Sequence, residues 1–381
     1  MPTKLLMTIE ELTTLDKLNK AFKESSKLSA WKESTQRYKA NLVINNLFLQ
    51  EELRNGDYKA SPTSNFSLNE RGKIRYIQAP AIRDRIVQKV LCTEILVPQL
   101  TKPLIYDNYA SLKHKGTSFA RKRVNVMLQR FLREHDYGYV LQIDIKSYFD
   151  NIDHDILKDM LHKRLKEPDE VIKLIDYIVD ISSDGDKGLN LGSEAPQIFA
   201  IYYLSPIDTY IKTVRGIKYY GRYMDDMFIL GKDKEELKLL LEDIKRELCK
   251  LKLRVNEKKT HIVKLSHGFT YMQIKYSIDG KKIIKRPCRK KITRERRRLK
   301  KHRNLLDKGV VDKKYIYNCY MSWRNSVNAD HNACKRTIST LDSLFNKLFG
   351  SIKKKKKLTR EDILREAFEN NSEYTNMLLT F

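Results

Sequence analysis

The sequence predicts an α+β protein in which short strands alternate with amphipathic helices. Residues 139–145 (YVLQIDI) alternate between apolar and polar side chains, as a half-buried strand does. Residues 217–231 are predicted to form strand, turn and strand around a pair of adjacent aspartates. Leucines and isoleucines recur at helical spacing over residues 234–253, which predicts a helix with one apolar face.

The composition is that of a globular, strongly basic chain. Its 381 residues are 41% hydrophobic, which is enough for a large core and for two or three domains. Lysine and arginine number 75 against 48 aspartates and glutamates, a net charge of +27. Such a field attracts polyanions. We therefore expect a nucleic-acid partner, with an anionic membrane surface and a merely solvated basic surface as the alternatives.

The cysteines and the hydropathy pattern exclude several classes of protein. The five cysteines are scattered and form no CxxC pair, which argues against a zinc ribbon or a disulfide scaffold. The N-terminus lacks the apolar run of a signal peptide, and no stretch approaches 18 apolar residues. A cytoplasmic protein that does not span a membrane is expected.

Helices are expected on both sides of the predicted strands. Residues 8–22 form an amphipathic helix with Thr8 as its N-cap, and the next helix stops at Asn55 and Gly56. Residues 195–213 are predicted to form one long buried helix despite Pro206. A hairpin is expected to turn at Asp279–Gly280.

Three aspartates carry the chemistry that the sequence suggests. Asp225 and Asp226 would point to opposite faces of a regular strand, whereas a tight turn lifts both carboxylates toward one edge. Adjacent carboxylates repel each other unless a cation neutralises them, so the pair invites Mg²⁺; an ordinary Asp-Asp turn is the alternative. Asp144 lies in an apolar strand, where a lone carboxylate is costly. One shared metal site would explain all three, and two ions shared by such carboxylates serve in-line phosphoryl transfer.

The two motifs together resemble the palm of a reverse transcriptase. IDIKSYFDNIDH precedes YMDD by 81 residues, and the likeness, over about residues 40–280, is to the bacterial group that includes group II intron enzymes and diversity-generating retroelements. The resemblance implies a right-hand polymerase fold, with an antiparallel sheet flanked by helices in fingers and palm, and a helical thumb. It implies an N-terminal helical extension (1–60), fingers (61–138), a palm interleaved with fingers elements (139–286), a basic helical thumb (287–350) and a basic tail (351–381).

The resemblance also assigns roles at the catalytic centre of an RNA-directed DNA polymerase. Asp144 and Asp225 would be the firm ligands of two Mg²⁺ ions, for which Mn²⁺ can substitute. Ile145 would lend its backbone carbonyl, and Asp226 would be a supporting charge. Lys259 matches the family's lysine, as a proton donor to pyrophosphate or a triphosphate contact, with Lys258 as its alternative.

Further residues are assigned to the substrates by the same resemblance. Lys73 and Arg75 would hold the dNTP triphosphate, and Phe149 would lie under the sugar and exclude a ribose 2′-hydroxyl; a core aromatic is the alternative for Phe149. Arg83 and Arg85 would touch template or phosphate, unless they are solvated surface cations. The basic thumb would contact phosphates of template RNA and primer or cDNA through Arg294, Arg297, Arg298 and Lys301. Trp323, Tyr315, Tyr317 and Tyr320 are expected in the thumb core, with stacking on bases as the alternative, and Lys353–Lys357 would strengthen RNA binding.

One segment departs from the intron enzymes. Residues 191–197 read LGSEAPQ, whereas intron-type enzymes read Q-G-x-x-x-S-P. The segment resembles the I-G-x-x-x-S-Q pattern of diversity-generating retroelement enzymes, with Pro196 in place of serine. Gly192 and Gln197 would then pack against the nascent base pair and alter nucleotide selection.

Three biological readings follow from this resemblance. The first is a diversity-generating retroelement enzyme that copies a template RNA with an accessory protein. The second is a phage-defence reverse transcriptase, for which a structured noncoding RNA is a further partner. The third is a catalytically inactive RNA-binding relic.

Overall fold

The computed structural model describes residues 6–70, 73–190, 192–328 and 335–350. Leu191 and the Lys353–Lys357 run therefore lie outside the described residues, as does the side chain of Lys73. The chain divides into two compact units, Met1–Ile284 and Lys285–Phe381, and each is considered by itself. The assignment of fingers, palm and thumb to residue ranges stays a prediction.

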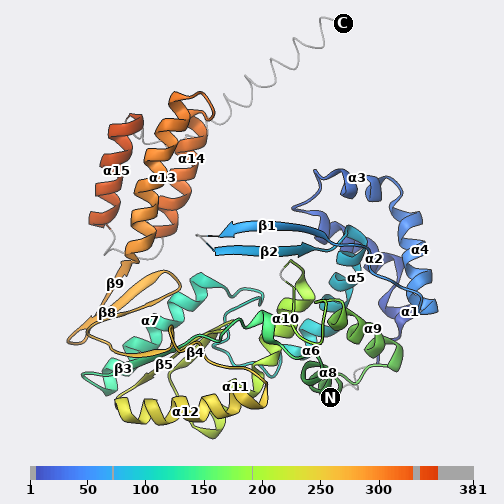
Figure 1. Cartoon of the computed structure of the whole chain (residues 1–381), viewed down its shortest axis with the longest axis horizontal. Helices are drawn as coiled ribbons and strands as arrows, with labels where there is room; N and C mark the ends of the chain where they lie inside the picture. The colour runs from blue at the N-terminus through green and yellow to red at the C-terminus, as the bar shows by residue number, and fades with distance from the viewer. Residues whose placement is uncertain (1–5, 71–72, 191, 329–334, 351–381) are drawn as a thin grey trace, which may run out of the picture. The chain divides into compact units, whose positions relative to one another are not determined.

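The first unit begins with four helices, α1 (Ile9–Leu12), α2 (Leu15–Ser26), α3 (Glu33–Ala40) and α4 (Leu42–Asn55) (Figure 1). Thr8 is the N-cap of α1, as predicted, but the single helix expected over residues 8–22 is interrupted at Thr13 and Thr14. The Thr8 Oγ1 accepts a hydrogen bond from the Glu11 backbone N–H at 3.2 Å, and the Glu11 carboxylate accepts one from the Thr8 N–H at 3.0 Å. Helix α4 ends at Gly56, whose φ of 76° is the left-handed conformation that glycine adopts without strain.

A two-stranded antiparallel ribbon and a group of helices follow. The ribbon is β1 (Ser64–Glu70) and β2 (Lys73–Ala79). After it come α5 (Ile82–Leu91), the π-helical η1 (Cys92–Leu96), α6 (Val97–Leu100) and α7 (Thr117–Glu134). The buried Asp84 carboxylate accepts hydrogen bonds from the Tyr58 hydroxyl (2.8 Å) and the Ser61 N–H (3.1 Å), which ties the chain before β1 to α5.

The central sheet has four antiparallel strands in the order β4-β5-β3-β6. They are β3 (Tyr139–Ile143), β4 (Tyr220–Tyr223), β5 (Asp226–Gly231) and β6 (His261–Lys264). Successive residues of β3 point to opposite faces of the sheet and belong to two hydrophobic clusters. Leu141 belongs to the cluster that contains residues of α12 (Lys234–Lys250). Val140 belongs to the cluster that contains residues of α7. Figure 1 shows these two helices on opposite sides of the sheet. Both faces are therefore covered, and only the strand ends are open for chemistry.

The segment between β3 and β4 is helical. It comprises the 3₁₀ turn η2 (Phe149–Asn151), α8 (His154–Arg164), α9 (Asp169–Asp180), α10 (Glu194–Tyr203), α11 (Ser205–Thr209) and the π-helical η3 (Tyr210–Val214). The prediction of one helix over residues 195–213 was wrong. The helix breaks at Leu204, and Pro206 lies in the first turn of α11, where its missing N–H costs no hydrogen bond.

A second, three-stranded sheet contains β7 (Phe269–Tyr271), β8 (Ile274–Asp279) and β9 (Lys282–Pro287). The hairpin through Asp279–Gly280 is confirmed, with φ of 53° at Gly280. The β7–β8 turn has positive φ at both central residues, Met272 (46°) and Gln273 (66°).

The second unit is a bundle of α13 (Arg289–Asp307), α14 (Lys313–Asn328) and α15 (Lys335–Phe349). Its core contains Leu299, Tyr320, Trp323, Leu341 and Phe345. Tyr320 and Trp323 are therefore core residues, as expected, whereas Tyr315 is exposed. The predicted α+β class is confirmed, and no helix in the described part is both long and apolar enough to cross a bilayer.

Gly221 in β4 generates a prediction about stability. A Cβ at this position would lie 2.3 Å from the hydroxyl oxygen of the buried Tyr109 and 2.9 Å from Phe228. We expect Gly221→Ala to lower the free energy of unfolding by about 1–3 kcal/mol, because the packed core must shift. Urea denaturation measures this. Gly185→Ala is the control, since a Cβ there meets nothing within 4 Å; equal stabilities for the two variants would contradict the tight packing around β4.

Candidate active site

Three carboxylates meet at one edge of the central sheet. Ile143, the last residue of β3, is paired with Met227 of β5, so the next step of the register sets Asp144 opposite Asp226. Asp225 lies in the two-residue turn between β4 and β5, because Tyr223 pairs with Asp226. The predicted turn and the predicted meeting of Asp144 with this hairpin are both confirmed.

The carboxylates perturb one another. Burial raises the pKa of Asp225, and the nearby Asp144 carboxylate raises it further. Desolvation, followed by the charges of Asp225 and Asp144, raises the pKa of Asp226 to about 7. Asp226 as a whole residue is exposed, so its carboxylate is only partly desolvated and stays accessible from solvent. The crowded negative charge of the cluster would therefore be relieved by a proton or by a bound cation.

Two side chains from the segment after α12 are bound to Asp144. The Lys259 ammonium donates to both carboxylate oxygens, at 3.1 and 2.9 Å, and Asn256 Nδ2 donates to Oδ1 at 2.9 Å. The Asn256 backbone N–H also donates to the Asp144 carbonyl at 2.7 Å. The hydrogen bond to Asp144 is the main cause that raises the pKa of Lys259. Lys258, the alternative to Lys259, instead lines a separate cavity of about 620 Å³.

A buried ion pair lies beneath the aspartate turn. Arg222 Nε donates to Asp208 Oδ1 at 2.9 Å and Arg222 Nη2 donates to Asp208 Oδ2 at 2.5 Å, and the side chains are 0% and 1% exposed. The Tyr220 hydroxyl donates to the same Asp208 carboxylate at 2.6 Å. Arg222 Nη2 also donates to the Ile201 carbonyl at 3.0 Å. The bidentate geometry and the added hydrogen bonds are what a fully buried charge pair requires.

The remaining donor of Arg222 supports the turn itself. Nη1 donates to the Met224 carbonyl at 3.0 Å. Met224 has a φ of 54°, a left-handed conformation that is unfavourable for a residue with a Cβ. Turns of this kind prefer glycine or asparagine at such a position. The Arg222 guanidinium therefore stabilises a strained turn and fixes the backbone that carries Asp225.

The donor set suits a hard divalent cation. Carboxylate oxygens are the ligands of Mg²⁺ and Mn²⁺, and three of them converge here. The Lys259 ammonium, already bound to Asp144, shows that the site accepts positive charge. Among the described residues no three Asp, Glu, His or Cys side chains already form a complete metal-binding group, so the metal assignment belongs to the proposals below. The role assigned to the Ile145 carbonyl also stays a prediction; Ile145 itself forms a bridge with Val255.

The residues predicted to bind dNTP lie on several elements. Arg75 of β2 is close enough to Asp225 for its charge to oppose the rise in the pKa of that carboxyl. Phe149 is half-buried in η2, with its ring edge against Tyr148 at 5.5 Å between centroids. Gly192 has a φ of 145°, and a Cβ there would lie 2.8 Å from the Gln78 carbonyl oxygen of β2. The structure thus brings Gly192 against the ribbon and Arg75 toward the carboxylates.

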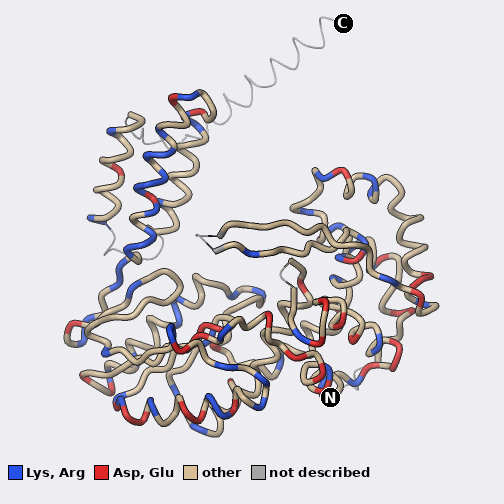
Figure 2. The backbone as a smooth tube through the Cα atoms, viewed as in Figure 1, with Lys and Arg blue, Asp and Glu red and all other residues tan. Residues whose placement is uncertain are grey.

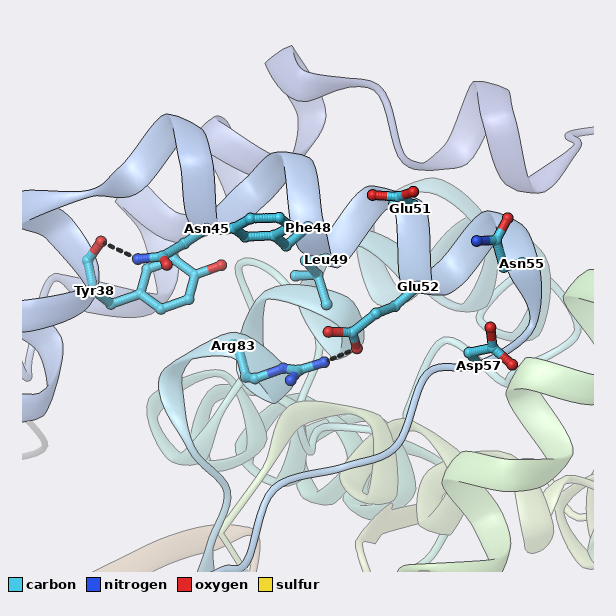
Figure 3. Close-up of a pocket in the computed structure, with 9 residues that line it drawn as sticks. All are labelled: Tyr38, Asn45, Phe48, Leu49, Glu51, Glu52, Asn55, Asp57 and Arg83. Atoms are coloured by element: carbon cyan, nitrogen blue, oxygen red, sulfur yellow. Dashed lines mark hydrogen bonds and ion pairs between the residues drawn. The ribbon is translucent and has the colours of Figure 1, made fainter.

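Three other residues that were predicted to contact substrates have partners within the protein. Gln197 Oε1 accepts a hydrogen bond from the Ser111 hydroxyl at 2.8 Å. Arg83 forms an ion pair with Glu52 in a pocket beside α4 (Figure 3). Its guanidinium also lies over the Tyr58 ring. Arg85 donates to the Ser25 carbonyl and the Ser29 hydroxyl, both at 3.1 Å. Nucleic-acid binding by these arginines stays a prediction.

The basic helix α13 presents a row of cations (Figure 2). Arg294, Arg297 and Lys301 are exposed at helical spacing. Arg298 is half-buried and donates to Glu295 Oε1 at 2.8 Å and to the Cys319 carbonyl at 3.0 Å. Exposed cations in a row suit phosphate contacts, whereas Arg298 is held within the bundle.

Sequence reasoning missed Arg222, Asp208 and Asn256. The signal for Arg222 was present, because a charged residue in the apolar stretch YYGRYM must find a buried partner. That partner, Asp208, comes from a separate helix, and its role was not marked by any local pattern. Asn256 stands in the segment that identified Lys259, but its bonds to Asp144 depend on the fold.

Comparisons with known proteins agree with this geometry. A family model described as "Reverse transcriptase (RNA-dependent DNA polymerase)" matches residues 59–277. The chain is 23% identical over 278 residues to Protein YkfC of Escherichia coli (strain K12), a match covering 61% of this chain and 71% of that protein.

Solved structures of telomerase from Candida Tropicalis also match. The apo enzyme gives a TM-score of 0.47 at 14% identity over 80% of this chain, and a form truncated from its C-terminal domain gives 0.46 at 13% over 64%. The matches cover 64% and 60% of those two chains, so this chain spans about three fifths of each.

The Arg222–Asp208 pair generates a prediction that separates stability from function. We expect Arg222→Met to lower the free energy of unfolding by about 3–5 kcal/mol, because Asp208 is left buried without its partner. The double variant Arg222→Met/Asp208→Leu should recover much of that stability, since both charges are gone. It should still lose about a hundredfold in RNA-templated primer extension, because the Met224 carbonyl has lost its donor. A double variant with wild-type activity would show that Arg222 only stabilises the fold.

Proposed function

Because the chain belongs to the reverse transcriptase (RNA-dependent DNA polymerase) family, a family of nucleotidyltransferases, we propose that it extends a primer with dNTPs on an RNA template. The observation that carries this proposal is the meeting of Asp144, Asp225 and Asp226 at one sheet edge, with Lys259 bound to Asp144. Family members use divalent metal ions, and the carboxylates here have the donor atoms for them.

We propose that Asp144 and Asp225 bind two Mg²⁺ ions, with Asp226 as a supporting charge and Mn²⁺ as a substitute. When bound, the ions supply the charge that activates the primer 3′-hydroxyl and stabilises the departing pyrophosphate. Asp225 is suited to this role because the turn that carries it is fixed from below by Arg222. Burial raises the pKa values of Asp225 and Asp226, and the neighbouring carboxylate charges raise them further, so a bound cation would be favoured here.

Lys259 and Arg75 are proposed to bind the triphosphate. The raised pKa of Lys259 keeps its ammonium protonated, so it can donate a proton to an oxygen of the leaving pyrophosphate. Neutralisation of Asp144 by a cation would free the ammonium for that contact. Arg75 is close to Asp225 and adds a second positive charge from the β2 strand. Phe149 is proposed to lie under the sugar and to select deoxyribose.

Template RNA and the primer or cDNA are proposed to bind by charge. The chain carries a net charge of +27, and exposed Arg294, Arg297 and Lys301 offer phosphate contacts on α13. Contacts of this kind give affinity without sequence reading and weaken steeply with salt. Arg298 would add less, because its guanidinium is held by Glu295 and Cys319.

Primer extension on an RNA template tests the proposed reaction. We expect Asp144→Asn and Asp225→Asn each to reduce synthesis by about 10³-fold or more, because the cations lose a firm ligand. Lys259→Ala should reduce the rate of chemistry with little loss of template binding. Asp184→Asn, at an exposed loop position, is the matched control and should keep wild-type activity.

Two outcomes would contradict the proposal. Synthesis that survives in Asp225→Asn would show that the metal site is misassigned. A wild-type protein that binds RNA but makes no DNA, with Mg²⁺ or Mn²⁺ and any required partner supplied, would favour the inactive RNA-binding reading.

For the biological role we propose a diversity-generating retroelement, which copies a template RNA with targeted errors and an accessory protein. The support is the Gly192–Gln197 segment, which resembles that group and packs closely on β2 at Gly192. Phage defence is the second candidate, because Pro196 departs from both patterns. A neighbouring pair of template and variable repeats in the genome would identify the retroelement.

An error spectrum on a defined RNA template tests the role of this segment. We expect errors concentrated at one template base, because an altered surface against the nascent pair changes base selection. Gln197→Ala should change that spectrum, and Ser111→Ala, which removes only its hydrogen-bond partner, should change it less. Ordinary, base-independent errors in the wild type would contradict the retroelement proposal and leave the polymerase assignment intact.

A further inference from the structure

Helix α4 packs one side against the described chain and exposes another side that carries large apolar side chains. Its inner side buries Asn46, Leu49, Gln50 and Leu53. Its outer side exposes Val43 (56%), Ile44 (55%), Leu47 (45%) and Phe48 (61%), which we call the α4 outer patch. Four large apolar side chains gathered on one exposed helix face therefore indicate an interaction surface.

The ends of the outer patch carry opposite charges. Lys39, in the last turn of α3, lies exposed just before α4 begins. Glu51 lies exposed near the other end of α4. Neither side chain belongs to an ion pair among the described residues. In chain order, a cation therefore precedes the four apolar side chains and an anion follows them.

A pocket of about 440 Å³ adjoins the acidic end of the patch (Figure 3). Phe48 and Leu49 contribute apolar walls, while Glu51, Glu52 and Asp57 contribute carboxylates. Arg83 is paired with Glu52 and therefore does not neutralise the other two. In a chain of net charge +27 this acidic pocket favours a basic side chain over a phosphate. Nucleic acid is disfavoured as the occupant for the same reason.

We infer that the α4 outer patch binds a second copy of this chain in a two-fold symmetric dimer. In a symmetric interface the same patch meets itself, so it must be self-complementary. If two α4 helices pack antiparallel about their midpoint between residues 45 and 46, Val43 lies opposite Phe48 and Ile44 opposite Leu47. Lys39 then approaches Glu51 and Glu52 of the partner subunit at the acidic pocket. Apolar side chains meet apolar ones, and both charged ends find opposite charges.

The oligomeric state of the full chain, freed of nucleic acid, tests this inference. Sedimentation equilibrium should show a reversible dimer, and Leu47→Asp should weaken the dimer at least about tenfold, since it buries a charge at the centre. Leu239→Asp is the matched control, because Leu239 is a 66%-exposed leucine on α12. Circular dichroism confirms that each variant is folded, and the charge reversals below supply milder changes at exposed positions.

Charge reversal identifies the partner as a second copy. Lys39→Glu and Glu51→Lys should each weaken self-association, because each places like charges at both ends of the interface. An equimolar mixture of the two variants should restore the dimer, since both ends of the mixed dimer regain opposite charges.

Several results would overturn the inference. A wild-type chain that stays monomeric at about 100 μM, a dimer unaffected by Leu47→Asp, or a mixture that fails to associate would each do so. Binding of this patch to RNA or to anionic vesicles, lost in Leu47→Asp without any change in self-association, would assign the surface to another occupant.

Discussion

The catalytic edge of this protein depends on a buried ion pair. Arg222 and Asp208 are almost fully excluded from solvent, and burying either charge alone would cost several kcal/mol. The pair is held in place by Tyr220 and by two backbone carbonyls, one of which belongs to Met224 in the strained turn. Because the guanidinium fork has a fixed geometry, the turn can adopt few positions relative to the helix that carries Asp208. The position of Asp225 is thereby coupled to the interior of the first unit.

The sheet register supplies the second constraint. Strand β3 lies between β5 and β6, so both the aspartate hairpin and the segment of Lys259 are aligned on it. A slip of one residue would move Asp144 to the other face of the sheet and separate it from Asp226. The two hydrophobic clusters prevent such a slip, since each buries alternate residues of β3. Packing on both faces thus fixes the geometry at the strand ends.

Much of the fold and the centre of the site could be predicted from the sequence, because both leave local signals. Alternation marked β3, and paired aspartates between apolar flanks marked the turn. The break at Leu204 was missed because the apolar composition of residues 195–213 favoured one buried helix, although Pro206 favours a new helix start. The Arg222–Asp208 pair could not be assigned from sequence, because each charge is explained only by a residue on another element. The same holds for Arg83: the family resemblance suggested a template or phosphate contact, and no local pattern indicated that it pairs with Glu52.

The carboxylate cluster lowers the free energy of unfolding at neutral pH. The pKa values of Asp225 and Asp226 are raised on folding, so the folded chain holds protons that the unfolded chain releases. For Asp226 the window runs from about pH 4, the value in unfolded chains, to about 7 in the fold. Between these two pH values the free energy of unfolding falls as pH rises. Above about pH 7 the full loss of stability from ionising Asp226 is present.

The charge of Lys259 offsets part of this loss, because it lowers the pKa values of Asp225 and Asp226, and a cation bound at the carboxylates would offset more. Divalent cations should therefore stabilise the fold most at neutral and higher pH, where the carboxylates are ionised. The same repulsion that weakens the metal-free protein gives the site its affinity for positive charge. A rigid turn is needed for this, because a mobile Asp225 would relieve the repulsion by moving away. The turn at Met224 and the buried Arg222 together fix the position of Asp225 beside the other carboxylates, as the proposed binding of a cation requires.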